Sequence, residues 1–413
     1  MPLPLDGAPQ PWAPLLTGDD AARARAALDA IADVLRDPAA AGLDPETETA
    51  GVAGGGSGLA VFFAQIGDEK TALDFLDRAI ERAATDSPTL PLYVGTPGVG
   101  WAMAYLERSV LDAEEGDNDV DELVEIGLKS ERWLAHHEFD LIRGCTGLGV
   151  YLLERGRPAD PAVTALERIS TETDDGVTWW VDPKTVPAER AEMFPEGYYD
   201  VGVAHGQAGV VAMLAWAHAA GTATAKGLLD PALAWLLKQR LPEQKGPGRY
   251  PLLFGPGTER NGGRMAWCYG DLGVSVALLA AGRALKDENV LREAFETAIS
   301  CAERPVEQTG AIDASLCHGA GGISLLFGRL HQAFGDERLA DAARTWARIL
   351  LDMRVDGEPV AGYRYSVPQG DGRGWEPRTG VLEGAAGVGL VLHALTSDVA
   401  PDWDSLFLTR PVA

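Results

Sequence analysis

Residues Gly270–Ala280 read GDLGVSVALLA, a Gly-x-x-Gly motif that leads into an almost continuous apolar run. The pattern recurs along the 413 residues of the chain, and this self-similarity is typical of a repeat fold. The Ala- and Leu-rich runs predict helices that are buried on most sides, each opened by a short glycine-rich turn. The other copies are GGSGLAVFF (Gly55–Phe63), GTPGVGWAMAYL (Gly95–Leu106), GCTGLGVYLLE (Gly144–Glu154), GQAGVVAMLAW (Gly206–Trp216), GAGGISLLFGR (Gly319–Arg329) and GAAGVGLVLHAL (Gly384–Leu395).

Amphipathic segments separate these motifs, and each has apolar residues on one helical face only. In the first of them Leu28, Ile31 and Leu35 share a face. An outer helix has one wet face and an inner helix has none, so the alternation predicts an all-α fold: an α/α toroid of seven inner and seven outer helices in a single domain, residues 1–413. The amphipathic segments are Asp20–Arg36, Lys70–Ala84, Asn118–Ala135, Pro161–Ile169, Thr222–Leu241, Asn289–Glu303 and Glu337–Met353.

Three long connections interrupt the repeat: Arg155–Asp200, Lys245–Gly263 and Gly362–Val381. Each leads into an inner helix, so all three are expected at the same end of the scaffold. Long loops grouped on a rigid scaffold often bind substrate, and solvated connections are the alternative.

Composition narrows the classes of function. With 35 Lys and Arg against 61 Asp and Glu, the formal net charge is -26, which argues against nucleic acid as a partner. The first residues lack the basic start and apolar run of a secretory signal, and no stretch is long and apolar enough to be a transmembrane segment. We therefore expect a cytoplasmic protein.

The four cysteines are too few for a disulfide framework, which directs attention to metal binding or catalysis. Cys268 and Cys317 both stand two residues before the first glycine of a repeat, whereas Cys145 and Cys301 are expected to be buried apolar side chains. Because equivalent repeat positions lie on one rim of a toroid, their side chains can converge. The position one residue before that glycine holds Arg143, His205, Tyr269, His318 and Glu383.

Cys268, Cys317 and His318 together offer two thiolates and an imidazole, a donor set that suits Zn²⁺. Three protein ligands leave the fourth tetrahedral position open, which is typical of catalytic zinc. A substrate thiol at that position would lose its proton near neutral pH, because coordination lowers its pKa. The pattern thus predicts one zinc per chain that activates a thiol.

The segments WCYG (Trp267–Gly270), CHG (Cys317–Gly319) and AHG (Ala204–Gly206), set within the seven repeats, resemble the lanthionine synthetase C-like family, the lanthipeptide cyclases. The resemblance covers nearly the whole chain. It implies an α/α toroid in which zinc assists addition of a peptide cysteine to dehydroalanine or dehydrobutyrine, forming lanthionine or methyllanthionine rings. It also implies a small β-containing insertion, matched by position with residues 155–200.

The resemblance further implies active-site roles for Asp140, His205, Arg264 and Tyr269. His205 titrates near neutral pH and is our candidate proton donor to the enolate, with a core histidine as the alternative. Arg264 would stabilise negative charge, and Asp140 would orient His205 or Arg264. The alternative is that Arg264 and Asp140 only form a structural ion pair. Tyr269 would hydrogen-bond the zinc-bound sulfur or the enolate oxygen, or only pack.

Partners follow from the same resemblance. The substrate would be a dehydrated precursor peptide, leader plus core, prepared by a separate dehydratase. The chain carries no kinase-like or lyase-like domain and so resembles a stand-alone cyclase, working with a transporter in a membrane-associated biosynthetic complex.

Other functions remain open at this point. The zinc toroid of the protein prenyltransferases also activates a thiol, but it uses a carboxylate ligand and a partner subunit. A thiol-alkylating enzyme could act on glutathione instead of a peptide. In a non-catalytic scaffold, zinc would only stabilise a surface that binds a peptide.

Overall fold

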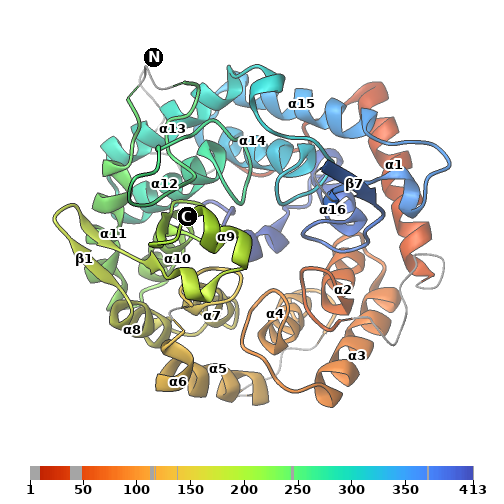
Figure 1. Cartoon of the computed structure of the whole chain (residues 1–413). Helices are drawn as coiled ribbons and strands as arrows, with labels where there is room; N and C mark the ends of the chain where they lie inside the picture. Colours follow the sequence, from red (N-terminus) through yellow and green to blue (C-terminus); the bar gives the residue numbers. More distant parts are fainter. Residues whose placement is uncertain are drawn as a thin grey trace. The chain divides into compact units, whose positions relative to one another are not determined.

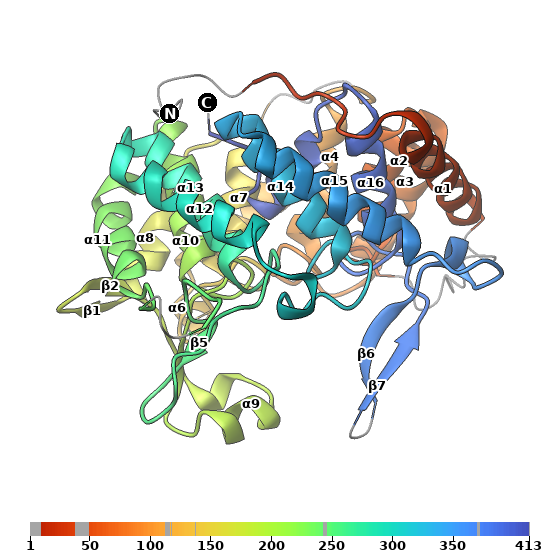
Figure 2. The same cartoon turned by 90° about the horizontal axis from the view of Figure 1, so that it is seen from above.

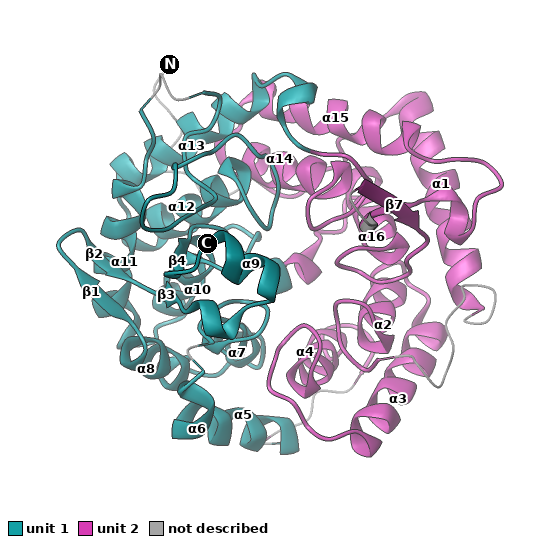
Figure 3. Cartoon of the chain, in the orientation of Figure 1, with its two compact units in different colours: residues 1–8, 117–310, 405–413 teal, residues 9–116, 311–404 magenta. Residues whose placement is uncertain are grey.

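A computed structural model describes residues 10–37, 49–111, 116, 118–136, 138–242, 246–369 and 372–412. Within this part of the chain, contacts between residues group the structure into two compact units (Figure 3). Unit 1 contains residues 118–310 and 405–412, and unit 2 contains residues 10–116 and 311–404. Each unit is built from pairs of one inner and one outer helix.

Unit 2 is a row of inner helices flanked by outer ones (Figure 1). Neighbouring inner helices contact one another in the order α14, α16, α2, α4, while α15 packs on α14, α1 on α16 and α3 on α2. The inner helices are α14 (Ala320–Phe334), α16 (Ala385–Thr396), α2 (Gly56–Gln65) and α4 (Thr96–Leu106), and the outer ones are α15 (Glu337–Asp352), α1 (Gly18–Arg36) and α3 (Glu69–Thr85).

Unit 1 repeats this plan, with inner helices that contact in the order α7, α10, α12. The outer helices α8, α11 and α13 pack on these three in turn, and α5 contacts α7 and α8. The inner helices are α7 (Cys145–Glu154), α10 (Gln207–Ala219) and α12 (Asp271–Leu285), and the outer ones are α5 (Asp119–Lys129), α6 (Glu131–Leu134), α8 (Asp160–Arg168), α11 (Ala225–Lys238) and α13 (Glu288–Ala302). Each predicted helix of both kinds is therefore present.

Burial separates the two kinds of helix as the sequence pattern predicts. In α10 ten of the eleven residues from Gln207 to Ala217 are buried, and Trp216 is the exception. In α15 only one face is buried, and it includes Leu339, Trp346 and Leu350. Burying one large apolar side chain stabilises the fold by roughly 1.5–3 kcal/mol. Burial therefore stabilises the fold more per residue in the inner helices than in the outer ones.

Close backbone approach explains the second glycine of the motif. A Cβ atom on Gly322 would lie 1.8 Å from the carbonyl oxygen of Leu316, and one on Gly387 would lie 2.0 Å from that of Val381. In both repeats the carbonyl belongs to the residue six positions earlier. A side chain there would push the turn away from the helix, so glycine is required for space rather than for a left-handed φ. Gly270 also needs its φ of +119°.

The connections between the helices contain several short strands. The hairpin β1 (Thr171–Thr173) and β2 (Gly176–Thr178) is followed by an antiparallel sheet in the order β3 (Trp180–Val181), β4 (Tyr198–Asp200), β5 (Leu253–Phe254). Strand β5 comes from a different connection, so two loops that are distant in the sequence share one sheet. A second hairpin, β6 (Tyr365–Gln369) and β7 (Gly372–Glu376), belongs to unit 2.

The predicted β-containing insertion at 155–200 is thus present, although outer helix α8 occupies part of it and its strands begin at Thr171. Between β3 and β4 lie the 3-10 turn η1 (Pro183–Thr185) and the helix α9 (Ala188–Met193). Figure 2 shows α9 and β5 projecting from one end of the unit 1 helices. Lys245, the first residue of the second predicted connection, lies outside the described residues. The remaining 3-10 turns are Val306–Gln308, Val360–Gly362 and Asp402–Phe407.

Among the helices of the described residues, none combines the length and the apolar character that crossing a bilayer requires.

Candidate metal centre and active-site pocket

The turn before α12 holds Cys268 firmly in unit 1. Its carbonyl oxygen accepts the backbone N–H groups of Val203 (3.0 Å) and Ala204 (3.3 Å), so the turns before α10 and α12 are joined by their main chains. Its neighbour Trp267 is almost fully buried and donates its indole N–H to the carbonyl of Phe407 at 2.8 Å. Cys268 is 5% exposed. Trp267 therefore anchors the turn that carries the cysteine.

The turn before α14 carries Cys317 and His318 in unit 2. The N–H of Cys317, which is 8% exposed, donates to the carbonyl of Leu382 at 3.0 Å. His318 Nε2 lies 3.2 Å from Asp313 Oδ2, and His318 Nδ1 lies 3.8 Å from Glu383 Oε1. The imidazole is thus oriented by a carboxylate that approaches one ring nitrogen.

Asp313 is a buried carboxylate whose partners favour its charge. It accepts the N–H of Ser315 at 3.0 Å and the Ser315 hydroxyl at 2.8 Å, in addition to its contact with His318. Burial alone raises the pKa of Asp313, but the hydrogen bond and charge of His318 outweigh burial and bring it to about 2. Asp313 is therefore an anion that fixes the His318 ring.

Cys268, Cys317 and His318 form a candidate metal site. Each offers one ligand atom, and these three atoms lie within 4.8 Å of one another. All three side chains are buried or nearly so, which keeps competing water away. Two sulfurs and one nitrogen fit a borderline-soft divalent ion such as zinc and leave one tetrahedral position open.

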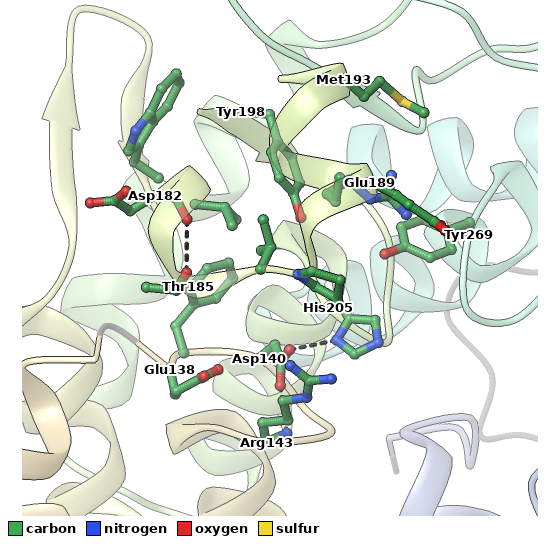
Figure 4. Close-up of a pocket in the computed structure, with 16 residues that line it drawn as sticks. Glu138, Asp140, Arg143, Asp182, Thr185, Glu189, Met193, Tyr198, His205 and Tyr269 are labelled. Carbon is green, nitrogen blue, oxygen red and sulfur yellow. Dashed lines mark hydrogen bonds and ion pairs between the residues drawn. The ribbon is translucent and has the colours of Figure 1, made fainter. Parts of the chain in front are cut away.

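A pocket of about 310 Å³ lies within unit 1 (Figure 4). On one side, His205 Nδ1 lies 2.5 Å from Asp140 Oδ2, and Asp140 Oδ1 accepts the N–H of Arg143 at 2.6 Å. The His205 side chain is 36% exposed, so it can reach a ligand in the pocket. Burial lowers the pKa of His205, but the hydrogen bond to Asp140 and the charge of that carboxylate outweigh burial and raise it.

Tyr269 lines the same pocket, and a second carboxylate holds it. Its hydroxyl donates to Asp200 Oδ2 at 2.9 Å, while Asp200 Oδ1 accepts the N–H of Gly202 at 2.9 Å. Burial raises the pKa of Asp200 to about 6, and burial with the Asp200 charge raises the pKa of Tyr269 well above its ordinary value. The phenol is therefore neutral, and its one proton is directed at Asp200.

Arg264 is the predicted active-site residue that does not line this pocket. Its carbonyl accepts the N–H of Asp271 at 3.3 Å, whereas its Nε is buried without a hydrogen-bond partner among the described residues. The pocket thus brings together Asp140, His205 and Tyr269. The expectation that Asp140 orients a catalytic group applies to His205, with which it is paired.

Asp200 and Asp313 are residues that the sequence reading missed. Both stand six positions before the first glycine of a repeat, as Glu138 and Arg264 also do. With Arg378, which stands six positions before Gly384, five of the seven repeats carry an ionisable residue at this position. The signal that could have found Asp200 and Asp313 is the same as for the two positions nearest the glycine, namely ionisable residues that recur at one position of the repeat.

Comparison with known proteins identifies the family. The profile described as lanthionine synthetase C-like protein matches residues 48–408. The chain belongs to the lanthionine synthetase C-like family. The resemblance predicted from the WCYG, CHG and AHG segments is thereby confirmed.

The chain can also be aligned with known proteins over most of its length. It is 25% identical over 333 residues to the nisin biosynthesis protein NisC of Lactococcus lactis subsp. lactis, which covers 73% of the chain and 72% of that protein. The solved structure of nisin cyclase matches with a TM-score of 0.67 at 19% identity, covering 87% of this chain and 92% of that one. The fold is therefore the α/α toroid, as the repeats predict.

Proposed function

We propose that this lanthionine synthetase C-like protein is a zinc-dependent lanthipeptide cyclase. It would add the thiol of a peptide cysteine to dehydroalanine or dehydrobutyrine within the same peptide and so form lanthionine or methyllanthionine rings. The observation that carries the proposal is the grouping of two cysteine sulfurs and one imidazole nitrogen within 4.8 Å, in a chain of this family.

Cys268, Cys317 and His318 would hold one zinc ion. A bound zinc ion would lower the pKa of a substrate thiol that coordinates it and so supply a thiolate near neutral pH. The chain's own contribution would be orientation: Asp313 approaches His318 Nε2 at 3.2 Å, so Nδ1, which lies 3.8 Å from Glu383 Oε1, would be the ring nitrogen offered to a metal.

His205 would supply the proton. In the addition, the sulfur–carbon bond forms at the β-carbon and the π electrons move to the carbonyl oxygen as an enolate, whose α-carbon must then be protonated. Asp140 engages Nδ1 of His205, so Nε2 is the nitrogen left to donate into the pocket. The raised pKa of His205 keeps this acid available near neutral pH.

Tyr269 and Arg264 take distinct roles in this proposal. The proton of Tyr269 is engaged by Asp200, so its oxygen would position substrate as an acceptor, and donation to the enolate would require the Asp200 contact to break. Arg264 remains our candidate for stabilising the enolate charge, because its Nε has no protein partner among the described residues.

Partners and place in the cell follow from the proposed reaction. The substrate would be a dehydrated precursor peptide with leader and core, which a separate dehydratase prepares and a transporter exports. We infer that the two units act as one domain in the cytoplasm, in a biosynthetic complex at the membrane.

The test is to incubate the purified protein with a dehydrated, cysteine-containing peptide. We expect an unchanged peptide mass with loss of free thiol, and about one zinc per chain. Replacing Cys317 by Ala should abolish both. The matched control is Cys301→Ala, because Cys301 is also buried but lies on the outer helix α13 and is not part of the candidate metal site.

Other outcomes would identify other functions. Activity only with glutathione, seen as an added mass, would indicate a different thiol-alkylating enzyme. Zinc without thiol loss for any peptide would contradict catalysis and leave a zinc-stabilised scaffold that binds peptides.

A further inference from the structure

One side of the pocket is built by residues 182–193, which we call the wall segment. It comprises η1 and α9 and contributes Asp182, Thr185–Pro187, Glu189, Arg190 and Met193 to the pocket lining. Figure 4 shows Tyr198, Glu189 and Met193 across the pocket from Asp140 and Arg143, with His205 between the two sides. The wall segment thus faces the proposed proton donor.

Helix α9 has no role in the core. It is six residues long, none of them is buried, and Met193 is 62% exposed. A helix this short has little stability of its own, so its ends must be held from outside. Directly after it, the buried ring of Phe194 packs on Tyr198 of β4 with centroids 4.8 Å apart. The helix is anchored at its end, while none of its own side chains is buried.

The position of the acid determines which part of a substrate enters this pocket. A general acid must approach the atom that it protonates to roughly 3 Å. Since His205 faces the pocket, the α-carbon of the dehydroamino acid has to lie there. The residues that flank it in the peptide then contact the pocket sides, including the wall segment.

We propose that the wall segment selects the residue next to the dehydroamino acid, and that Met193 is a specificity-determining residue that favours an apolar side chain there. This inference rests on the proposed function. Trp180, Val186, Pro187 and Met193 give the wall side an apolar surface. Methionine is unbranched and adaptable, so it can pack against apolar side chains of several shapes.

Charges on the pocket sides disfavour an acidic neighbour. Glu138, Asp182 and Glu189 line the pocket, and burial together with the charge of Asp140 raises the pKa of Glu138, so negative charge is already unfavourable there. Of the two pocket arginines, Arg190 lies over the Tyr198 ring, 5.8 Å from its centroid, and is engaged within the wall. Lys184 of the wall segment does not line the pocket, so an acidic flanking residue would face these carboxylates with no unengaged cation from the wall segment in the pocket lining.

The experiment measures competition between dehydrated peptides that differ only in the residue flanking dehydroalanine, which is Leu, Lys or Asp. The wild type should cyclise the Leu peptide fastest and the Asp peptide slowest. Met193→Glu should raise the Lys-to-Leu rate ratio by about tenfold, because the new carboxylate attracts the ammonium group, and Met193→Leu should leave the ratio unchanged. The matched control is Ile126→Glu, which places the same charge at a 59% exposed apolar position of α5, outside the pocket.

The same set of peptides with Ala in place of Cys separates this proposal from the proposed function. Their dissociation constants do not depend on thiol chemistry, so they report selection by the wall even if no ring forms. A Lys-to-Leu affinity ratio that rises in Met193→Glu but not in Ile126→Glu supports the proposal whether or not the wild type cyclises. A ratio that is equal in both variants and the wild type overturns it, and absence of thiol loss in the wild type refutes only the proposed function.

Discussion

The turns before α10 and α14 each place a histidine directly before the first glycine of the repeat, yet the two imidazoles are held through opposite ring nitrogens. His205 is engaged at Nδ1, 2.5 Å from Asp140 Oδ2. His318 is engaged at Nε2, 3.2 Å from Asp313 Oδ2. The two carboxylates come from different repeat positions, four residues before the glycine for Asp140 and six for Asp313.

In the proposed function, this difference would give the two side chains different chemistry. A carboxylate oxygen only accepts, so the ring nitrogen that faces it carries a proton. In His318 the protonated nitrogen would be Nε2, and Nδ1, which lies 3.8 Å from Glu383 Oε1, would be the nitrogen offered to a metal, as is usual for histidine ligands that a carboxylate orients. In His205 the free nitrogen is Nε2, which can deliver a proton into the pocket when the ring is charged. If the proposed roles hold, one repeat position would serve as metal ligand or as acid, depending on where its carboxylate lies.

The largest effects should come from removing each histidine. We expect His318→Ala to lose zinc and activity together, because two cysteines alone hold the ion poorly.

His205→Ala should keep about one zinc per chain while ring formation slows by roughly 10²–10⁴-fold, the usual effect of losing a general acid. Metal analysis and single-turnover rates on the same preparations measure both. Loss of zinc from His205→Ala would break the distinction between the two residues.

The sequence predicts the helices and the three residues of the candidate metal site because both follow from the repeated Gly-x-x-Gly pattern. Each inner helix begins at a Gly-x-x-Gly, where a carbonyl approaches too closely for any Cβ, as at Gly322. The sheet could not be predicted: strands of two or three residues show no periodicity, and Val181, Tyr198 and Phe254 are brought together across distant segments. The missed carboxylates Asp200 and Asp313 lie outside the two positions nearest the glycine.

An intermediate effect is expected at Asp313. Asp313→Ala should weaken zinc binding by about 10–100-fold, because His318 loses the partner that fixes its ring. Asp313→Asn should lose less, since its side-chain oxygen can still accept from Nε2. Chelator competition measures the affinity, with Asp341→Asn on the exposed face of α15 as the control. Equal zinc affinity in Asp313→Ala and the wild type would mean that the ring is held by packing alone.

The smallest effect is expected from Asp140→Asn, and it should depend on pH. His205, as the proposed acid, is active only when it is protonated. We therefore expect a high rate of ring formation below the pKa of His205 and a falling rate as the pH rises through it. Asp140 raises that pKa against the opposing effect of burial. Removing its charge should therefore move the alkaline limb of the pH–rate profile to lower pH, with little loss on the acidic side.

Glu138→Gln is the control for this prediction, because it removes a carboxylate that lines the same pocket but makes no side-chain hydrogen bond to His205 among the described residues. Its alkaline limb should shift less than that of Asp140→Asn. If both variants shift equally, the pocket's overall charge sets the acidity of His205 and the hydrogen bond adds nothing. If neither shifts, the ionisation that limits the rate belongs to another group, and the contact with Asp140 does not set the acidity of His205.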